Sequence, residues 1–357
     1  MIDKPAGPTS HGCVAAVRRA YGLKRVGHGG TLDPAVTGVL PIALGPATRL
    51  LPYLRGDKLY RAVVQLGVRT SSDDLEGDVL ERRSPPVLDT GALEEALAGF
   101  RGEILQRPPA VSAVHVGGER AYARARRGEV VELPPRPVTI HSLQLLGWDP
   151  AEARLELEVR CSAGTYIRSL ARDLGEHLGC GAALARLRRT ETLGFDLSTA
   201  VDLERLARGP RPPLLDPLLA LGHLERRQLQ VEEQPSWRCG RALPLRAVAR
   251  SIAEVLGTPA CTSPGAVEGL NMTSCPTPTE VIREASAAGL RVCAAGSAAL
   301  DGPPGAAASD SHGGAAGSDT SEAPAYAILN PDGSLAGIAR LDPAGLLRPR
   351  LVFDAAG

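Results

Sequence analysis

The sequence carries no net charge and is poor in aromatic residues. Its 357 residues include 40 basic and 40 acidic side chains, but only three Phe, two Trp and six Tyr. A chain with no overall excess of lysine and arginine gives no global electrostatic argument for a nucleic-acid partner. Charge that is segregated along the chain would still allow one, so the neutral total alone does not decide the class of partner.

The sequence also lacks long apolar runs and paired cysteine motifs. No stretch approaches the roughly 18 apolar residues of a membrane-spanning helix, and the residues after Met1 show no apolar segment of a secretory signal. The seven cysteines are odd in number and never spaced C-x-x-C, which argues against a disulfide framework or a zinc site. These absences predict a cytoplasmic protein without membrane association and without a bound metal.

Length and patterning predict an α+β protein of two or three units, at roughly 100–200 residues each. A hydrophobic fraction of 43% is enough for a sizeable core. Residues 154–160 alternate polar and apolar side chains like a half-buried strand, and residues 60–66 form a second predicted strand. A helix is predicted after them, with Thr165 as its N-cap and Gly179 as its C-terminal stop. The absence of a regular βαβ rhythm favours α+β over a doubly wound sheet.

Charge is indeed distributed unevenly along the chain. The segment at about 247–324 holds 3 basic and 8 acidic residues, so the rest of the chain carries 37 basic and 32 acidic residues, a net charge of +5. Within it, residues 294–324 are almost wholly Ala, Gly, Ser, Pro and Asp, a composition that predicts a flexible tract. Residues 107–137 carry several arginines and predict a basic, mobile excursion from the sheet. The neutral total therefore results from an acidic segment at about 247–324 that offsets a basic remainder of the chain.

The C-terminal part of the chain predicts a small β domain. Residues 325–329 and 335–339 are apolar and flank residues 330–333, which read Asn-Pro-Asp-Gly and indicate a hairpin turn. The domain is predicted to begin near residue 228, so that the acidic segment divides it. A long insertion in a surface loop costs little closure entropy, so we expect the fold to tolerate it.

The strongest chemical signal is at residues 27–34, which read Gly-His-Gly-Gly-Thr-Leu-Asp-Pro. Glycine allows close approach by a ligand, and Pro34 biases Asp33 toward an extended conformation. An aspartate in a stiff loop beside a histidine is a candidate nucleophile or acid–base group. The local pattern also fits an Asx-turn that caps the next segment, so both interpretations stay open on this pattern alone.

Motifs in a fixed order resemble the TruB family of tRNA pseudouridine-55 synthases. They include Asp3-Lys4-Pro5, the loop at 27–34, Thr37-Gly38 and Asp57-Lys58-Leu59-Tyr60. Others follow at 66–74, 106–113, 161–168 and 187–189. The resemblance covers about residues 2–225, and a weaker resemblance to the family's PUA-like RNA-binding domain covers about 228–246 and 325–353. The family usually has a few more apolar residues before Asp3, so either the first strand is short or the natural start lies upstream.

The resemblance implies a fold and an activity. The expected fold is a mixed, mainly antiparallel sheet flanked by helices in a catalytic domain of residues 1–225, with 107–137 as an RNA-gripping thumb-like segment. Residues 226–357 are expected to form the PUA-like domain, interrupted at about 247–324. The implied activity is isomerisation of uridine to pseudouridine at position 55 in the T-loop of tRNA, without cofactor or metal.

Asp33 resembles the family's catalytic aspartate, and its attack at C1′, attack at C6 or removal of a proton at C2′ all stay open. Arg168 matches the arginine that pairs with this carboxylate, since a guanidinium stays charged and can hold it bidentately. Tyr60 matches the tyrosine that stacks on the flipped uracil. Taken alone, Arg168 would fit a solvated helix residue, and Tyr60 would fit ordinary packing at the start of a strand.

The resemblance also implies substrate-binding residues. His28 would fill the space of the flipped nucleotide. The uridine pocket would be lined by Tyr166, Leu187 and Asp74. Phosphates would be neutralised by Arg120 and Arg124. Ordinary turn, core or surface positions are the alternatives for each. Sequence recognition would come from the shape and splayed bases of the T-loop.

Two other functions compete with this one. The protein could bind and remodel tRNA with an incidental aspartate, or it could be a guide-RNA-dependent catalytic subunit like the related eukaryotic and archaeal enzymes. The thumb-like segment at 107–137 favours a stand-alone enzyme that acts on the tRNA T-arm as a monomer, with no guide RNA.

Overall fold

The computed structural model describes residues 1–112, 133–245 and 323–353, together with residues 115, 116, 119, 120, 124, 127 and 129. These described residues belong to one compact unit. The predicted insertion at about 247–324 lies almost entirely outside the described residues, and so does much of the thumb-like segment at 107–137.

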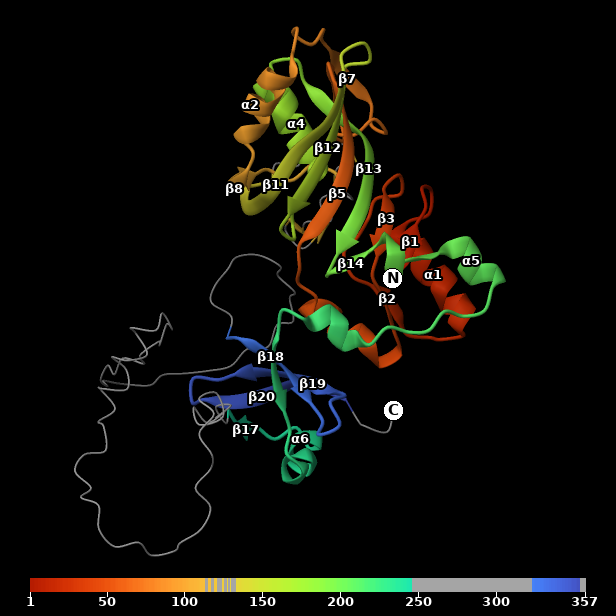
Figure 1. Ribbon diagram of the computed structural model, residues 1–357, viewed down its shortest axis with the longest axis vertical. Coiled ribbons are helices and arrows are strands. Elements are labelled where there is room, and N and C mark those ends of the chain that lie inside the picture. Colours follow the sequence, from red (N-terminus) through yellow and green to blue (C-terminus); the bar gives the residue numbers. More distant parts are fainter. Residues whose placement is uncertain are drawn as a thin grey trace, which may run out of the picture. The chain divides into compact units, whose positions relative to one another are not determined.

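A nine-stranded mixed sheet forms the larger part of the fold (Figure 1). Its strands run in the order β15-β1-β3-β13-β5-β12-β11-β8, with β14 paired to β13. Neighbours are antiparallel except for β1 with β15 and β3 with β13. The bounds are β1 Ile2–Lys4, β3 Thr37–Leu40, β5 Lys58–Leu66, β8 Gly102–Gln106, β11 Arg136–Asp149, β12 Arg154–Cys161, β13 Ala182–Thr192, β14 Phe195–Asp196 and β15 Val201–Asp202.

The period-two pattern of the long strands creates one apolar and one polar face. Along β5 and β12 alternate side chains are buried, from Tyr60 to Leu66 and from Leu155 to Cys161. The opposite face carries ion pairs between neighbouring strands, such as Arg61 with Glu158 at 3.3 Å and Arg160 with Glu191 at 2.8 Å. One face therefore forms the core, while the other stays polar.

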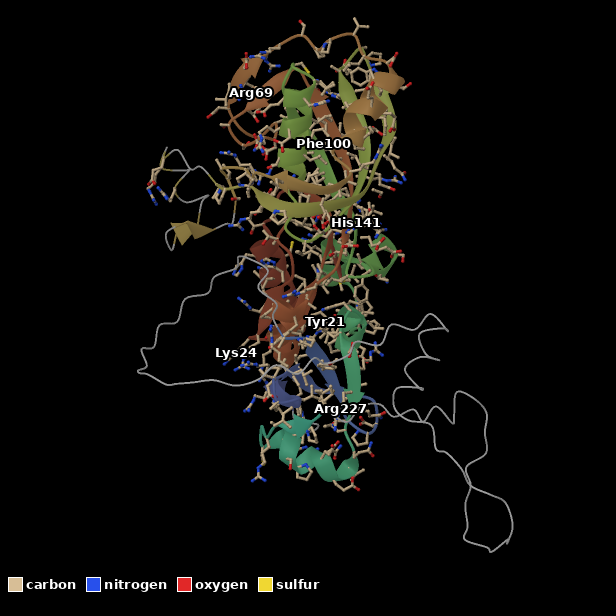
Figure 2. The ribbon with its side chains drawn as sticks, turned by 90° about the vertical axis from the view of Figure 1, so that its left-hand side faces the viewer. Tyr21, Lys24, Arg69, Phe100, His141 and Arg227 are labelled. Atoms are coloured by element: carbon tan, nitrogen blue, oxygen red, sulfur yellow. The ribbon has the colours of Figure 1, made fainter. Side chains whose placement is uncertain are left out.

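Helices α2 (Thr90–Ala98) and α4 (Ile167–His177) lie beside the long strands in Figure 1, and their buried side chains join those of the strands in one hydrophobic core. Phe100, labelled in Figure 2, meets His177 edge-on with ring centroids 6.0 Å apart. Helices α1 (Ser10–Tyr21) and α5 (Leu203–Arg208) pack near β1 in a separate apolar cluster. Three of the predicted site residues, Arg168, Tyr60 and Leu187, come from the first turn of α4, from β5 and from β13.

The predicted helix after residue 162 is present as α4, but its N-cap differs from the prediction. The N-cap is Tyr166, which makes no side-chain capping bond, whereas the Thr165 hydroxyl donates to the Ser162 carbonyl at 3.0 Å. Thr165 as N-cap is therefore wrong, because its hydroxyl is used inside the preceding turn. Gly179 is confirmed at the helix end, with a φ of +73° and its N–H donating to Glu176 O.

Shorter elements connect the main ones. Their bounds are β2 Val26–His28 with β4 Ile42–Leu44, β6 Val68–Thr70 with β7 Val79–Arg82, β9 His115–Val116 with β10 Glu119–Arg120, and the 3-10 helices η1 Gly45–Tyr53, η2 Leu197–Thr199, η3 Pro217–Leu221 and η4 Val231–Glu233. No helix among the described residues is both long and apolar enough to cross a membrane.

The C-terminal residues form a second, five-stranded sheet in the order β16-β18-β19-β20-β17. Its elements are β16 Glu225–Gln228, β17 Leu243–Pro244, β18 Ala325–Leu329, β19 Leu335–Leu341, β20 Leu346–Val352 and helix α6 Gln234–Arg238. The predicted hairpin is confirmed: β18 and β19 are antiparallel, and Gly333 in their turn has a φ of +85°. Trp237 is 1% exposed and donates its indole N–H to Ala336 O at 3.0 Å. The α+β class, with a mixed, mainly antiparallel sheet and a small second β sheet, is confirmed.

Candidate active site

Asp33 lies in the loop between β2 and β3, and its backbone is fixed on both sides. The Gly7 N–H donates to the Pro34 carbonyl at 2.9 Å, and the Val36 N–H donates to the Asp33 carbonyl at 3.1 Å. The second bond closes a tight turn through Pro34, whose ring restricts the backbone. The Asp33 side chain remains 48% exposed, so the carboxylate faces outward from a rigid loop.

Lys4 anchors this loop from β1. Its side chain is fully buried, and its ammonium donates to Pro5 O at 2.9 Å, Pro34 O at 2.8 Å and Val36 O at 2.7 Å. Burial lowers the pKa of Lys4, while nearby Cys13 and Asp33 act in the opposite direction. Three carbonyl acceptors use the three donors of the ammonium, so Lys4 holds the chain on the C-terminal side of Asp33.

Ser10 and Arg189 hold the other side of the loop. The Ser10 hydroxyl donates to Leu32 O and accepts from Leu32 N–H, both at 2.9 Å. Arg189 is fully buried on β13 and donates to Val39 O at 2.8 Å and to Gly30 O at 2.9 Å. The buried cations Arg189 and Lys4 both donate hydrogen bonds to backbone carbonyls in or next to this loop. Side chains from distant parts of the sequence therefore position it.

Arg168 stands at the first turn of α4 with its guanidinium against Asp33. The Nη2 to Asp33 Oδ2 distance is 3.0 Å, and the Arg168 side chain is 7% exposed. Its nitrogens also donate to the carbonyls of Ser72 and Val111, both at 2.9 Å. The structure therefore brings together the two residues that the resemblance pairs, and the guanidinium is fixed independently of the carboxylate.

Asp74 lies on the other side of the same guanidinium. Its Oδ2 is 3.6 Å from Arg168 Nη1, which is an ion-pair distance rather than a hydrogen bond. Asp74 Oδ1 accepts from the Ser72 hydroxyl at 2.5 Å and from Glu76 N–H at 3.1 Å. Asp74 therefore places a second negative charge beside the Arg168 guanidinium, while its own hydrogen bonds go to Ser72 and Glu76.

A cavity of about 260 Å³ opens beside Asp33. Its lining residues are Thr31, Leu32, Asp33, Val36, Lys58, Tyr60, Gly164, Thr165, Tyr166, Ile167, Arg168 and Leu187. The cavity thus combines one carboxylate and two cations with apolar and aromatic walls, which is the composition of a small-molecule or nucleoside site.

The two tyrosines of the cavity are held rigidly. Tyr60 is 6% exposed, and burial raises the pKa of its hydroxyl. Burial also raises the pKa of Tyr166, whose backbone N–H donates to Gln106 Oε1 at 2.8 Å while its carbonyl accepts from Gln106 Nε2 at 3.0 Å. Both rings therefore stay neutral near pH 7, and a single amide on β8 fixes the backbone of Tyr166.

His28, Asp74, Arg120 and Arg124 are not among the residues that line this cavity. His28 ends β2, and burial lowers the pKa of its imidazole, with His11 and Arg189 adding to the effect. Arg124 is paired with Glu129 at 2.6 Å, and the backbone of Arg120 belongs to β10. The structure brings Asp33, Arg168, Tyr60, Tyr166 and Leu187 together, with Asp74 against the guanidinium.

Lys4, Ser10, Lys58, Gln106 and Arg189 were not predicted as site residues. A signal for the two lysines does exist, because only three of the 40 basic residues are lysine: Lys4, Lys24 and Lys58. Two of the three lie at or behind this site. No comparable signal distinguishes Arg189 among the remaining 37 basic residues, all of which are arginine.

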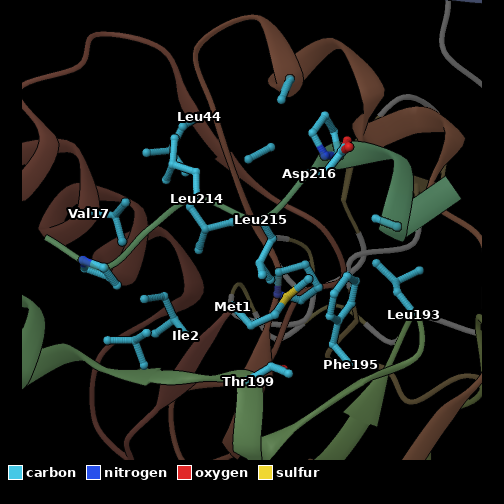
Figure 3. A pocket seen from close by; sticks show the side chains of 18 of the residues that line it. Met1, Ile2, Val17, Leu44, Leu193, Phe195, Thr199, Leu214, Leu215 and Asp216 are labelled. Carbon is cyan, nitrogen blue, oxygen red and sulfur yellow. The ribbon is translucent and has the colours of Figure 1, made fainter. Parts of the chain in front are cut away.

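A larger cavity of about 430 Å³ lies elsewhere and is almost purely apolar (Figure 3). Ile2, Leu44 and Phe195 are among its walls, and the Asp216 carboxylate at its edge accepts the Leu218 N–H. It holds no cluster of groups for acid–base chemistry. Among the described residues no group of three or more His, Cys, Asp or Glu side chains could hold a metal ion.

The site can perform nucleophilic or general-base chemistry on a flat, polar heterocycle. A half-exposed carboxylate is oriented by a guanidinium that two backbone carbonyls hold in place. A neutral aromatic ring in the same cavity can stack on a base that has left a helix. The geometry serves attack at an electrophilic carbon and removal of a proton equally well.

The fold is similar to that of two solved structures. The "Structure of H/ACA RNP bound to a substrate RNA containing 2'-deoxyuridine" aligns at a TM-score of 0.58 and 20% identity, covering 99% of this chain and 84% of that chain. The "Crystal Structure of a Cbf5-Nop10-Gar1 Complex" aligns at a TM-score of 0.58 and 22% identity, covering 95% and 76%. These likenesses define the class of fold to which the chain belongs.

Sequence comparison narrows this class to one family. Residues 18–167 match the model of the TruB family pseudouridylate synthase N-terminal domain, and residues 168–210 match the tRNA pseudouridylate synthase B C-terminal domain. The chain is 70% identical over 245 residues to "tRNA pseudouridine synthase B" of Parasynechococcus marenigrum (strain WH8102), covering 69% of this chain and 84% of that protein. It is 61% identical over 246 residues to the protein of that name from Prochlorococcus marinus (strain MIT 9313), covering 68% and 77%. The chain belongs to the TruB family of pseudouridine synthases.

Proposed function

We propose that this protein isomerises uridine to pseudouridine at position 55 in the T-loop of tRNA. The observation that carries the proposal is the Asp33 carboxylate, 3.0 Å from the Arg168 guanidinium, at a cavity walled by Tyr60. The names of the relatives, tRNA pseudouridine synthase B, support tRNA as the substrate. A uridine inside a folded RNA must be flipped out before a carboxylate can reach its sugar or ring.

In the proposed reaction Asp33 begins the cleavage of the bond between C1′ and N1. It does so as a nucleophile or as a base, oriented by Arg168, which Asp74 holds from the other side. Tyr60 stacks on the freed uracil, and such stacking is worth about 1–3 kcal/mol per base. Tyr166 and Leu187 wall the pocket while the ring turns and reattaches through C5. His28 occupies the place of the flipped nucleotide.

The remaining parts of the chain are proposed to grip the RNA. Residues 1–225 would be the catalytic domain, and residues 226–357 a PUA-like RNA-binding domain interrupted at about 247–324. The C-terminal sheet has a hydrophobic cluster of its own around Trp237, which supports this division, and it packs through Ile338 and Leu351 against Leu50 of η1. Arg120 and Arg124 of the thumb-like segment at 107–137 would neutralise phosphates, which makes affinity salt-dependent.

We further propose a stand-alone, monomeric enzyme of the cytoplasm. The structural neighbours include H/ACA ribonucleoproteins, but the two relatives at 70% and 61% identity carry no such name. In the described part of the chain Cys13, Cys161, Cys180 and Cys239 are free thiols, which supports a reducing compartment. Activity on a T-arm hairpin without added RNA or protein would separate this proposal from a guide-RNA-dependent subunit.

The proposal is tested with purified protein and an unmodified tRNA transcript. Mass-resolved mapping should find pseudouridine at position 55 with the wild-type protein. Asp33→Asn, which keeps the shape of the side chain, should reduce conversion by more than about 10³-fold while tRNA binding changes little. A wild-type protein that binds tRNA and leaves this uridine unconverted would support a tRNA-remodelling protein and refute the enzyme.

A further inference from the structure

Two cations line the catalytic cavity, and they differ in how their charge is compensated. Arg168 has its guanidinium against the Asp33 and Asp74 carboxylates and donates to two backbone carbonyls. Its positive charge is therefore compensated by the two carboxylates, and its N–H groups already have acceptors, before any substrate binds. Lys58 also lines the cavity, at the first position of β5, but its surroundings are different.

Lys58 is an uncompensated cation within the described part of the chain. Its ammonium makes no hydrogen bond and no ion pair there, and the carboxylate of the adjacent Asp57 is 3.1 Å from His141 Nε2 instead. Its cross-strand neighbours are Cys161 on β12 and Thr192 on β13. Burial raises the pKa of the Cys161 thiol to about 11, so this neighbour is neutral near pH 7 and supplies no negative charge.

Holding such a cation in place destabilises the folded protein. Burial lowers the pKa of Lys58, and the positive charge of Arg189 lowers it further. A partly buried charge without a partner costs free energy, and an apolar side chain of the same length would avoid that cost. Lysine at this position, in a chain with only three lysines, indicates that the ammonium is needed for an anion that arrives with the substrate.

The position of Lys58 indicates which anion this is. Residues two apart on a strand point to the same face, so Lys58 and Tyr60 extend from β5 toward the same side of the sheet, and both line the cavity. Tyr60 is the residue proposed to stack on the uracil ring. The ammonium therefore lies beside the place proposed for the base, rather than on the exposed surface that the RNA backbone would follow.

We propose that the Lys58 ammonium stabilises the uracil anion that forms when the glycosidic bond breaks. This inference rests on the proposed function. If Asp33 attacks C1′, its oxygen bonds to that carbon while N1 leaves with the electron pair of the C1′–N1 bond. If Asp33 removes the C2′ proton, the C–H electrons form a C1′–C2′ double bond and N1 again leaves with its pair. Both routes place a full negative charge on uracil, delocalised onto its carbonyl oxygens, within reach of Lys58.

The test compares the chemical step in the wild-type protein and in Lys58→Gln. With enzyme in saturating excess over tRNA, the single-turnover rate should fall about 10²-fold, the usual effect of losing one preorganised group that stabilises developing charge. The dissociation constant for tRNA should change less than threefold. Lys24→Gln is the matched control, since Lys24 is exposed, lies outside the cavity and is labelled in Figure 2; its rate should equal that of the wild type.

A second substrate separates charge stabilisation from a structural role. A tRNA with 5-fluorouridine at position 55 releases a more stable anion, because fluorine withdraws electrons, so its glycosidic cleavage depends less on Lys58. The fold-decrease that Lys58→Gln causes in the single-turnover rate of glycosidic cleavage should therefore be at least fivefold smaller on the fluorinated tRNA than on the natural one. A merely structural defect would slow both substrates equally, and that result would refute the proposal.

Two further results would also overturn it. If Lys58→Gln keeps the wild-type rate, Lys58 takes no part in the step. Lys58 contacts a phosphate instead if its replacement leaves the saturated rate unchanged but weakens tRNA binding, and if it also lowers by about one the slope of the logarithm of affinity against the logarithm of salt concentration. Lys58→Met serves as a second neutral variant should the glutamine variant not fold. A wild-type protein without activity would refute the proposed function itself, whereas an active wild type with a fully active variant refutes only the role of Lys58.

Discussion

Ser10→Ala should destabilise the protein and slow its reaction together, because one hydroxyl satisfies both backbone groups of Leu32. The substitution removes a single atom, which donates to Leu32 O and accepts from Leu32 N–H at 2.9 Å each. Ser10 is 3% and Leu32 is 4% exposed, so water does not readily replace the lost partner. Each buried, unpaired backbone group costs about 1–3 kcal/mol, and we expect a loss of about 3 kcal/mol after relaxation of the loop.

The effect on turnover follows from the position of Leu32, directly before Asp33. A shift of the carboxylate by about 1 Å can cost up to 10²-fold in rate, so we expect turnover to fall about 10- to 100-fold at a temperature where the variant is folded. Thr9→Ala is the matched control. Thr9 caps α1, the helix that begins at Ser10, by accepting the Gly12 N–H at 2.9 Å. It makes no hydrogen bond to the catalytic loop, which comprises residues 29–36 between β2 and β3.

The assay is urea unfolding followed by tryptophan fluorescence, together with pseudouridine formation on a tRNA transcript. Trp148 reports on the catalytic sheet, where its indole N–H donates to Leu88 O at 3.2 Å. Thr9→Ala should lose about 1 kcal/mol and keep its turnover. The reasoning is refuted if Ser10→Ala loses no more stability than Thr9→Ala, or if it turns over at the wild-type rate.

Two other predictions concern Gly38 in β3 and His28 in β2, the strands on either side of this loop. Gly38→Ala should cost about 3 kcal/mol or more, since Gly38 has a φ of +108° and a methyl group there would collide with the Arg189 carbonyl. Gly12→Ala is the control: Gly12 lies in α1, and an added methyl group would have its nearest neighbours, Pro8 and Thr9, at 3.5 Å, so the variant should be neutral or slightly stabilising. Equal thermal stability of the two variants would contradict this. The lowered pKa of His28 means that the unfolded chain binds more protons than the folded one below the ordinary value of 6.5. The free energy of unfolding should therefore decrease as pH falls from 7.5 to 5.5, and His28→Gln should show a smaller decrease in urea titrations; an unchanged slope would show that His28 does not contribute.

The elements with a clear period were predictable from the sequence, because burial on one face of an element leaves a direct pattern in its residues. The alternation at 154–160 gave β12, the spacing of apolar residues after Ile167 gave α4, and the turn at 330–333 gave the hairpin of β18 and β19. The cap of α4 was predicted wrongly, because the choice between Thr165 and Tyr166 depends on which carbonyl the hydroxyl of Thr165 reaches.

The sequence by itself also determined the family and the candidate pair of Asp33 and Arg168, since ordered motifs survive without knowledge of the fold. Only the tertiary structure decided how that pair is held. Lys4, Ser10 and Arg189 are far apart in the chain, and each acts on backbone carbonyls or amides of the catalytic loop, which no side-chain pattern records. The structure likewise distinguished the two cations of the cavity. Charge compensation depends on which groups face one another in space. Arg168 has the Asp33 and Asp74 carboxylates beside its guanidinium, whereas Lys58 has no partner among the described residues.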